Sequence, residues 1–137
     1  MDLEQLVRTR AIERVEVPAR EIAGLLGAAR RDIRTAQTLA ATDLDWAFIA
    51  AYNAILQLSL AYMNSLGYRP RGEGHHYNAF RFMEIALPEE TVMVKWLQKL
   101  RRKRNCTHQA LRDHAPRSAT HQAISAAAAS AAIACHS

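Results

Sequence analysis

The fold is decided by residues 43–67, which read DLDWAFIAAYNAILQLSLAYMNSLG. Asp43 and Asp45 suit the start of a helix, because a carboxylate there accepts hydrogen bonds from the first N–H groups of the helix. Gly67 is the residue type that most often follows a helix end. Between these signals, apolar residues recur at three- and four-residue steps, which predicts one long amphipathic helix. The expected buried stripe consists of Trp46, Ile49, Ala50, Asn53, Leu56, Leu60 and Met63.

The preceding segment predicts a second long helix, which begins at Pro18 and ends near Thr42. Proline is favoured in a first helical turn, where its missing N–H has no partner to lose. Four arginines, at positions 20, 30, 31 and 34, lie mostly off the apolar stripe of this helix. The stripe itself consists of Ile22, Leu25, Leu26, Ala29, Ile33, Ala36 and Ala40.

Two more helices are expected downstream of the loop at residues 68–76, YRPRGEGHH. The first runs from about His75 to Leu87. The second starts at Pro88, with two glutamates next to it at the positive end of the helix. The third helix is expected to bury Ala79, Phe82 and Met83, and the fourth Met93, Trp96, Leu97 and Leu100, continuing to Leu111.

These patterns predict an all-α fold, an antiparallel up-and-down bundle of four to five helices, because short connections join neighbouring antiparallel helices. No strand signal and no internal repeat is present. The expected organisation is a polar lead-in at residues 1–17, the helical bundle at 18–114, and an Ala-rich C-terminal helix or tail at 115–137.

The composition is that of one globular domain, since 50% of the 137 residues are hydrophobic. A net charge of +5 favours an anionic partner such as nucleic acid, or serves only solubility. Cys106 and Cys135 are too far apart for a zinc knuckle and suit a reducing compartment. We expect a cytoplasmic protein, because neither a signal peptide nor an unbroken apolar run of about 18 residues occurs.

The most informative segment for chemistry is KWLQKLRRKRNCTHQALRDH, at residues 95–114. With Leu97 at the centre of the buried face, helical geometry places Arg104 and His108 on the apolar stripe, one turn apart. A buried guanidinium requires a partner, which is a carboxylate, a second subunit or a phosphate. Arg101 and Asn105 flank the same edge of the helix.

Two interpretations of Arg104 and His108 stand side by side. An arginine offers a fork of donors that fits a phosphate, and a histidine moves protons near neutral pH. Together they suffice for metal-free RNA cleavage, in which the 2′-hydroxyl is the nucleophile. Alternatively, His108 is an ordinary core histidine, and Arg104 pairs across the bundle with a carboxylate of Asp32, Asp43 or Glu84.

The remaining cationic and histidine clusters are less specific. Arg101, Arg102 and Lys103, together with Arg104, Lys95 and Lys99, form a basic run that tracks a nucleic-acid backbone or merely complements the helix dipole. Adjacent His75 and His76 point in different directions on a helix, which favours capping or packing over metal binding. We expect neither a metal site nor a cofactor.

Four stretches of the chain resemble the HEPN superfamily of small helical domains found in bacterial defence and toxin–antitoxin systems. They are AARRDIRTAQTLA at 28–40, DLDWAFIAAYNAILQLSLAYMNSLGYRP at 43–70, GEGHHYNAF at 72–80 and LRRKRN at 100–105. The resemblance covers roughly residues 18–111. It implies a four-helix antiparallel core with an added short helix, usually as a homodimer.

For the site, the resemblance implies an arginine followed by a polar residue and then a histidine on a late helix, forming a metal-independent RNase centre across a dimer. Arg104 and Asn105 match the first part, whereas His108 follows Arg104 after a shorter interval than is usual in the family. We therefore favour a dimeric module that binds RNA, a nucleotide, or a nucleotidyltransferase or antitoxin partner. The alternative is an RNase toxin that uses Arg104 and His108.

Overall fold

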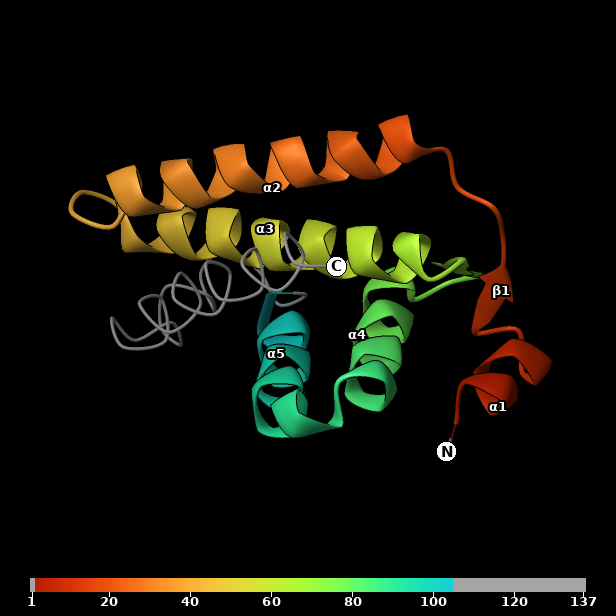
Figure 1. Cartoon of the computed structure of the whole chain (residues 1–137). Helices are drawn as coiled ribbons and strands as arrows, with labels where there is room; N and C mark the ends of the chain where they lie inside the picture. The colour runs from red at the N-terminus through yellow and green to blue at the C-terminus, as the bar shows by residue number, and fades with distance from the viewer. Residues whose placement is uncertain (1, 105–137) are drawn as a thin grey trace.

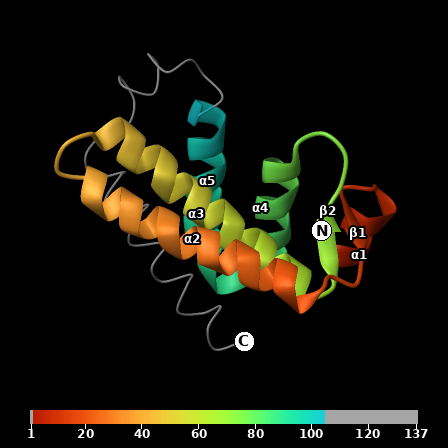
Figure 2. The ribbon, with the colours of Figure 1, turned by 90° about the horizontal axis from the view of Figure 1, so that it is seen from above.

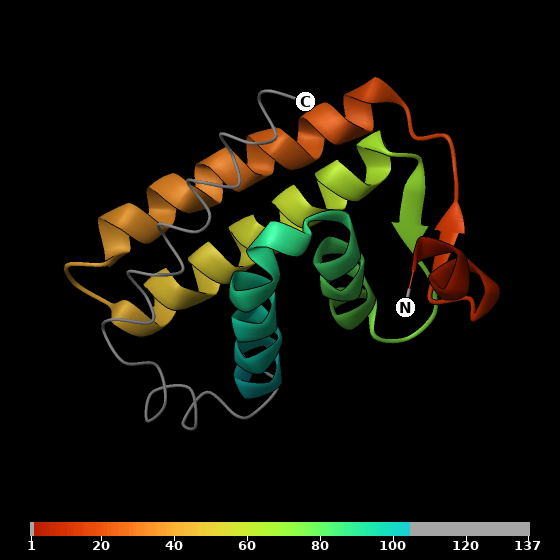
Figure 3. The same cartoon turned by 60° about the horizontal axis from the view of Figure 1, so that its bottom comes forward.

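The computed structural model describes residues 2–104, with the backbone alone at positions 91, 93, 96, 100, 103 and 104. The helices α2 and α3 form one antiparallel hairpin and α4 and α5 a second, and the two hairpins cross steeply (Figure 1, Figure 2 and Figure 3). In chain order the elements are α1 (Leu3–Arg8), β1 (Ile12–Arg14), α2 (Ala19–Leu39), α3 (Leu44–Ser65), β2 (Tyr68–Pro70), α4 (His75–Ala86), the 3-10 helix η1 (Pro88–Glu90) and α5 (Thr91–Arg104).

The predicted helical character is confirmed, but the described part is not all-α, because β1 and β2 pair in a small sheet. Within each hairpin the two helices are antiparallel, as a short connection between them requires. The hairpins nevertheless do not align in one up-and-down bundle, since α4 and α5 lie across the α2–α3 pair (Figure 3).

Helix α2 follows the predicted stripe closely. It begins directly after Pro18 and ends at Leu39, three residues before the predicted end. Its most buried residues are Ala29 and Ala36, and its arginines are exposed. The helix packs on α3, so that one of its faces is covered and the other meets solvent.

The predicted ends of α3 are confirmed. Asp43 caps its start, where Oδ1 accepts a hydrogen bond from the Trp46 N–H at 3.3 Å, and Gly67 follows its end with a φ of +86°. The predicted one-sided stripe is wrong, because α3 packs on both α2 and α4 and therefore buries residues around most of its circumference. Trp46, predicted to be buried, is 54% exposed.

The composition of α3 reflects this central position. In residues 2–104 it is the helix that is long and apolar enough to cross a membrane, with a mean hydropathy of 1.3 over an 18-residue window. Of that window, 56% is buried inside the protein. A core helix covered on two sides has the same length and composition, because it has little polar surface to present to water.

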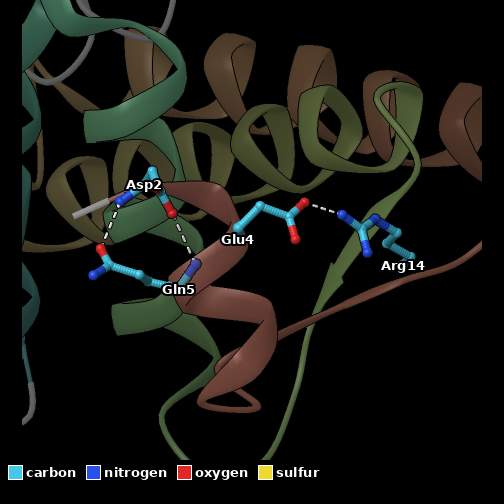
Figure 4. Close-up of polar contacts among 4 residues, drawn as sticks. All are labelled: Asp2, Glu4, Gln5 and Arg14. Atoms are coloured by element: carbon cyan, nitrogen blue, oxygen red, sulfur yellow. Dashed lines mark hydrogen bonds and ion pairs between the residues drawn. The ribbon is translucent and has the colours of Figure 1, made fainter.

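Within the predicted polar lead-in, residues 2–17 form the short helix α1 and the strand β1. Asp2 and Gln5 form a reciprocal capping box at the start of α1, and the Glu4 carboxylate pairs with the Arg14 guanidinium (Figure 4). The side chains of Leu6 and Ile12 are fully buried in the main core. This segment therefore packs on the domain through two apolar side chains. They form no recognisable apolar stripe in the sequence, because the residues around them are mostly polar.

Strands β1 and β2 pair antiparallel, with Ile12 opposite Pro70 and Arg14 opposite Tyr68. Backbone hydrogen bonds from the Val15 N–H to the Gly67 carbonyl and from the Arg71 N–H to the Ala11 carbonyl, both 2.9 Å, extend the pairing at its ends. The sequence analysis placed Tyr68–Pro70 in a loop, because three residues are too few for an alternating pattern to be visible.

The limits of the third predicted helix are confirmed to within one residue, whereas the predicted end of the fourth helix at Leu111 lies outside the described residues. Helix α4 ends at Ala86, one residue before the predicted end, and Pro88 opens the turn η1 that leads into α5. The buried face of α4 includes Asn78 and Phe80 besides the predicted Ala79 and Phe82. On α5, Val94, Leu97 and Gln98 are buried, which confirms Leu97 as an inward residue.

Candidate functional site

A pocket of about 430 Å³ lies where the start of α4 meets the second half of α5. It is lined by the loop residues 72–74, by the first three residues of α4, at 75–77, and by Arg101 of α5. Gly72 and Gly74 have φ values of +72° and +77°, a backbone conformation that favours glycine. The two glycines therefore allow the tight turn that brings this loop to the pocket.

Gln98 fixes Arg101 at the wall of the pocket. The Gln98 side chain is 7% exposed; its Nε2 donates to the Tyr77 carbonyl at 3.1 Å, and its Oε1 accepts from Arg101 Nε at 3.0 Å. This leaves the two terminal nitrogens of Arg101 as the remaining donors of the fork. The buried Gln98 side chain thus links Tyr77, at the start of α4, to Arg101 of α5.

Two guanidinium groups flank the ring of Tyr77. The Cζ atoms of Arg101 and Arg81 lie 5.2 Å and 5.3 Å from the ring centroid, within the range of cation–π attraction. Both positive charges are therefore held beside the Tyr77 ring. An anion in the pocket would contact Arg101, whose position is fixed by Gln98 and by the Tyr77 ring.

His76 is held in place by a contact with a core residue, Tyr52. Its Nδ1 and the hydroxyl of the fully buried Tyr52 are 3.2 Å apart and hydrogen-bonded, and the Tyr52 ring packs edge-on against Phe80. His76 therefore lines the pocket from a position that its contact with Tyr52 fixes. His75 is exposed.

The backbone at the start of α4 also suits an anion. No side chain caps this helix, and its first internal hydrogen bond runs from the Asn78 N–H to the Gly74 carbonyl at 3.0 Å. The N–H groups of the three preceding residues consequently have no partner within the helix. Such N–H groups and the helix dipole both favour negative charge.

Glu73 is the acidic residue of the pocket, because it lines the same space as Arg101. A bare anion would be repelled by this carboxylate. A ligand that carries both an anionic group and hydroxyl groups can satisfy both residues, since a carboxylate accepts hydrogen bonds from hydroxyls. The pocket volume lies within the usual range for small-molecule sites, about 300–1,000 Å³.

The structure separates the residues that the sequence analysis grouped together. Arg101 turns toward the pocket, whereas Arg102, the next residue, is exposed. Lys103 and Arg104 end α5, described by backbone alone, and Asn105 and His108 lie outside the described residues. The predicted catalytic group of Arg104, Asn105 and His108 therefore stays a prediction.

The residues of the predicted basic run do not all lie on the same side of α5. Lys95, Lys99 and Arg102 are all exposed and lie at helical spacing on the solvent side of α5. Of the carboxylates considered as partners for Arg104, Asp32 accepts a hydrogen bond from Gln57 at 3.0 Å, and Asp43 caps α3. Both therefore already have a structural role.

Sequence reasoning missed the pairing of the 72–77 segment with Arg101. The histidine pair was expected to cap or pack, and His76 does pack against Tyr52. The signal that was available is the alternation of Gly72 and Gly74 immediately before a helix start. Within residues 2–104, no group of three or more His, Cys, Asp or Glu side chains is placed to hold a metal ion.

Comparison with known proteins assigns no relative. No protein-family model, no curated protein and no solved structure matches the chain. The resemblance to the HEPN superfamily accordingly stays a prediction drawn from the quoted motifs.

Proposed function

We propose that this chain is an HEPN-like helical module that binds RNA or a free nucleotide by holding one nucleotide unit in the pocket between α4 and α5. The observation that carries the proposal is the placement of Arg101, fixed through Gln98, opposite the uncapped start of α4. Arg101 and the backbone N–H groups suit the phosphate, and Glu73 suits the ribose hydroxyls.

The resemblance adds the assembly to this proposal. It favours a homodimer with α5 near the two-fold axis, and a nucleotidyltransferase or antitoxin as partner in a toxin–antitoxin-type system. Light scattering over micromolar concentrations tests the dimer, and co-purification with the product of a neighbouring gene tests the partner.

The experiment is titration calorimetry with the four nucleoside 5′-monophosphates and with inorganic phosphate. We expect nucleotides to bind more tightly than phosphate, because only they carry ribose hydroxyls that reach Glu73 while the phosphate contacts Arg101. Arg101→Gln should weaken nucleotide binding about tenfold or more, the loss expected when a hydrogen bond to a charged group is removed. Arg102→Gln is the matched control, since it removes the same charge from an exposed neighbour that does not line the pocket.

Glu73→Gln separates the two roles of that carboxylate. If Glu73 accepts hydrogen bonds from ribose, this variant loses the preference for nucleotides over phosphate. If it only repels the anion, both ligands bind more tightly. The proposal fails if the wild-type protein binds neither nucleotides nor a short RNA, or if Arg101→Gln binds nucleotides as tightly as wild type. Gel analysis of the RNA after incubation with chelator shows whether binding is accompanied by cleavage.

A further inference from the structure

The outer face of α2 is a second cationic surface, on the other side of α3 from the pocket. Helix α2 lies at the outside of the fold, with α3 between it and α4 (Figure 1 and Figure 2). Arg20, Arg30, Arg31 and Arg34 are all exposed. At 100° per residue they fall within an arc of about 100° that faces away from Ala29 and Ala36, and they span about 21 Å along the axis.

The two acidic residues of α2, Glu21 and Asp32, also contact other elements. Glu21 pairs with Arg69 of β2 at 3.3 Å. Asp32 is turned toward α3, where one oxygen accepts from Gln57 Nε2 at 3.0 Å and the other lies 3.9 Å from Arg31 Nε. The Asp32 side chain is 20% exposed, whereas that of Arg31 is 69% exposed. Arg31 therefore keeps most of its guanidinium accessible on the outer face.

The residues between the arginines are small. Gly27 lies within the same arc and Gly24 about 20° outside it, and a Cβ added at either position would meet nothing within 4 Å. No large apolar or aromatic residue interrupts the arginines, as the segment from Arg20 to Arg34 carries its leucines and isoleucines on the covered side. Among residues 2–104, the result is a basic face with open space over its glycines.

The arginines and the small residues of this face favour one class of polyanion over others. A helix that lies in a membrane surface inserts large apolar side chains, and the outer face of α2 has none. A surface for single-stranded nucleic acid stacks bases on aromatic side chains, and these are also absent here. A line of arginines over one helix face fits the regularly spaced phosphates of a duplex.

We infer that the outer face of α2 docks on the phosphate backbone of a nucleic-acid duplex, without reading its sequence. The inference goes beyond the nucleotide pocket and does not depend on it, because the two surfaces share no residue. Each arginine that neutralises one phosphate should add about one unit to the slope of log affinity against log salt concentration.

The test is fluorescence anisotropy with a duplex RNA, a duplex DNA of equal length and the corresponding single strands, over a range of KCl concentrations. The double variant Arg31→Gln/Arg34→Gln should reduce the salt slope for duplexes by about two units. The matched control is Arg8→Gln/Arg10→Gln, which removes two exposed charges from the α1 region and should leave the slope unchanged. Glutamine preserves helix propensity, and circular dichroism checks the fold.

A second variant, Gly27→Glu, keeps all four arginines and places a carboxylate between them, in open space. It should weaken duplex binding without loss of stability. The inference is overturned if the α2 double variant keeps the wild-type slope, if the α1 control lowers it equally, or if vesicles of acidic phospholipid bind in an α2-dependent way and duplexes do not. Nucleotide binding, measured in the same α2 variant, should be retained; its absence in wild type would contradict the pocket proposal alone.

Discussion

The two sides of α3 are covered in different ways. On one side, α2 buries small residues most deeply, Ala29 and Ala36. On the other side, α4 buries Phe80 and Phe82, and Phe80 packs edge-on against Tyr52 with ring centroids 6.0 Å apart. Small residues let two helices lie close together but remove little apolar area from water, whereas each aromatic ring removes much more. A single buried side chain should therefore contribute more packing energy on the α4 side, beside the pocket, whereas α2 is held on α3 by many smaller contacts along a longer interface.

The largest expected effect follows directly. Phe80→Ala should lower the free energy of unfolding by about 3–5 kcal/mol, because it removes a fully buried ring and leaves a cavity beside Tyr52. Urea denaturation measures the change. Val92→Ala, at a position that is 85% exposed, is the control and should change stability by less than about 0.5 kcal/mol. A loss below about 1 kcal/mol for Phe80→Ala would remove the distinction between the two sides.

The α2 side should be sensitive to size instead. Ala36→Leu adds three carbon atoms at a position that is 0% exposed, and should destabilise the protein by about 1–3 kcal/mol through overpacking. The same measurement on Ala23→Leu, at an exposed position of the same helix, supplies the control. If Ala36→Leu is tolerated as well as Ala23→Leu, the two helices are not closely packed at this point.

The same comparison explains how much of the fold the sequence could predict. Helix α2 has one covered face, so its apolar stripe was identified correctly. Helix α3 has two covered faces, so a single stripe could not describe it, and Trp46 was placed in the core although it is 54% exposed. The α1–β1 segment could not be found by periodicity, because its contribution to the core depends on Leu6 and Ile12 and on a pairing with residues far along the chain.

The candidate site was predictable only in part. The inward position of Leu97 implies that Arg101, four residues later, shares its face, and the sequence analysis placed Arg101 at that edge. The partners of Arg101 could not be inferred, because Gln98 and Tyr77 meet it through tertiary contacts between α4 and α5. Arg102 belongs to the same predicted basic run as Arg101, but it is exposed, as expected of the next residue on a helix, which points in a different direction.

A smaller effect is expected at the polar contact that joins α4 to α5. Gln98→Ala removes the hydrogen bonds to the Tyr77 carbonyl and to Arg101 Nε, and should cost about 1–2 kcal/mol of stability. It should also weaken nucleoside monophosphate binding, since Arg101 loses the group that positions it. Gln37→Ala, at an exposed position of α2, is the control for both measurements. Loss of stability with unchanged nucleotide affinity would show that Gln98 is structural only.

The smallest expected effect has the opposite sign and tests whether the outer face of α2 is open. Glycine in the interior of a helix costs roughly 0.5–1 kcal/mol relative to alanine, because it loses more backbone freedom on folding. At Gly27 the added Cβ meets nothing within 4 Å, so Gly27→Ala should raise the free energy of unfolding by about that amount. Ala36→Gly, on the covered face of the same helix, should lower it, because it also removes a buried methyl group. Urea denaturation with an unchanged m value measures both changes. A neutral or destabilising Gly27→Ala in the free protein would mean that another molecule, such as a second copy of the chain, covers this face in solution, and the contrast between an open α2 side and a packed α4 side would then have to be abandoned.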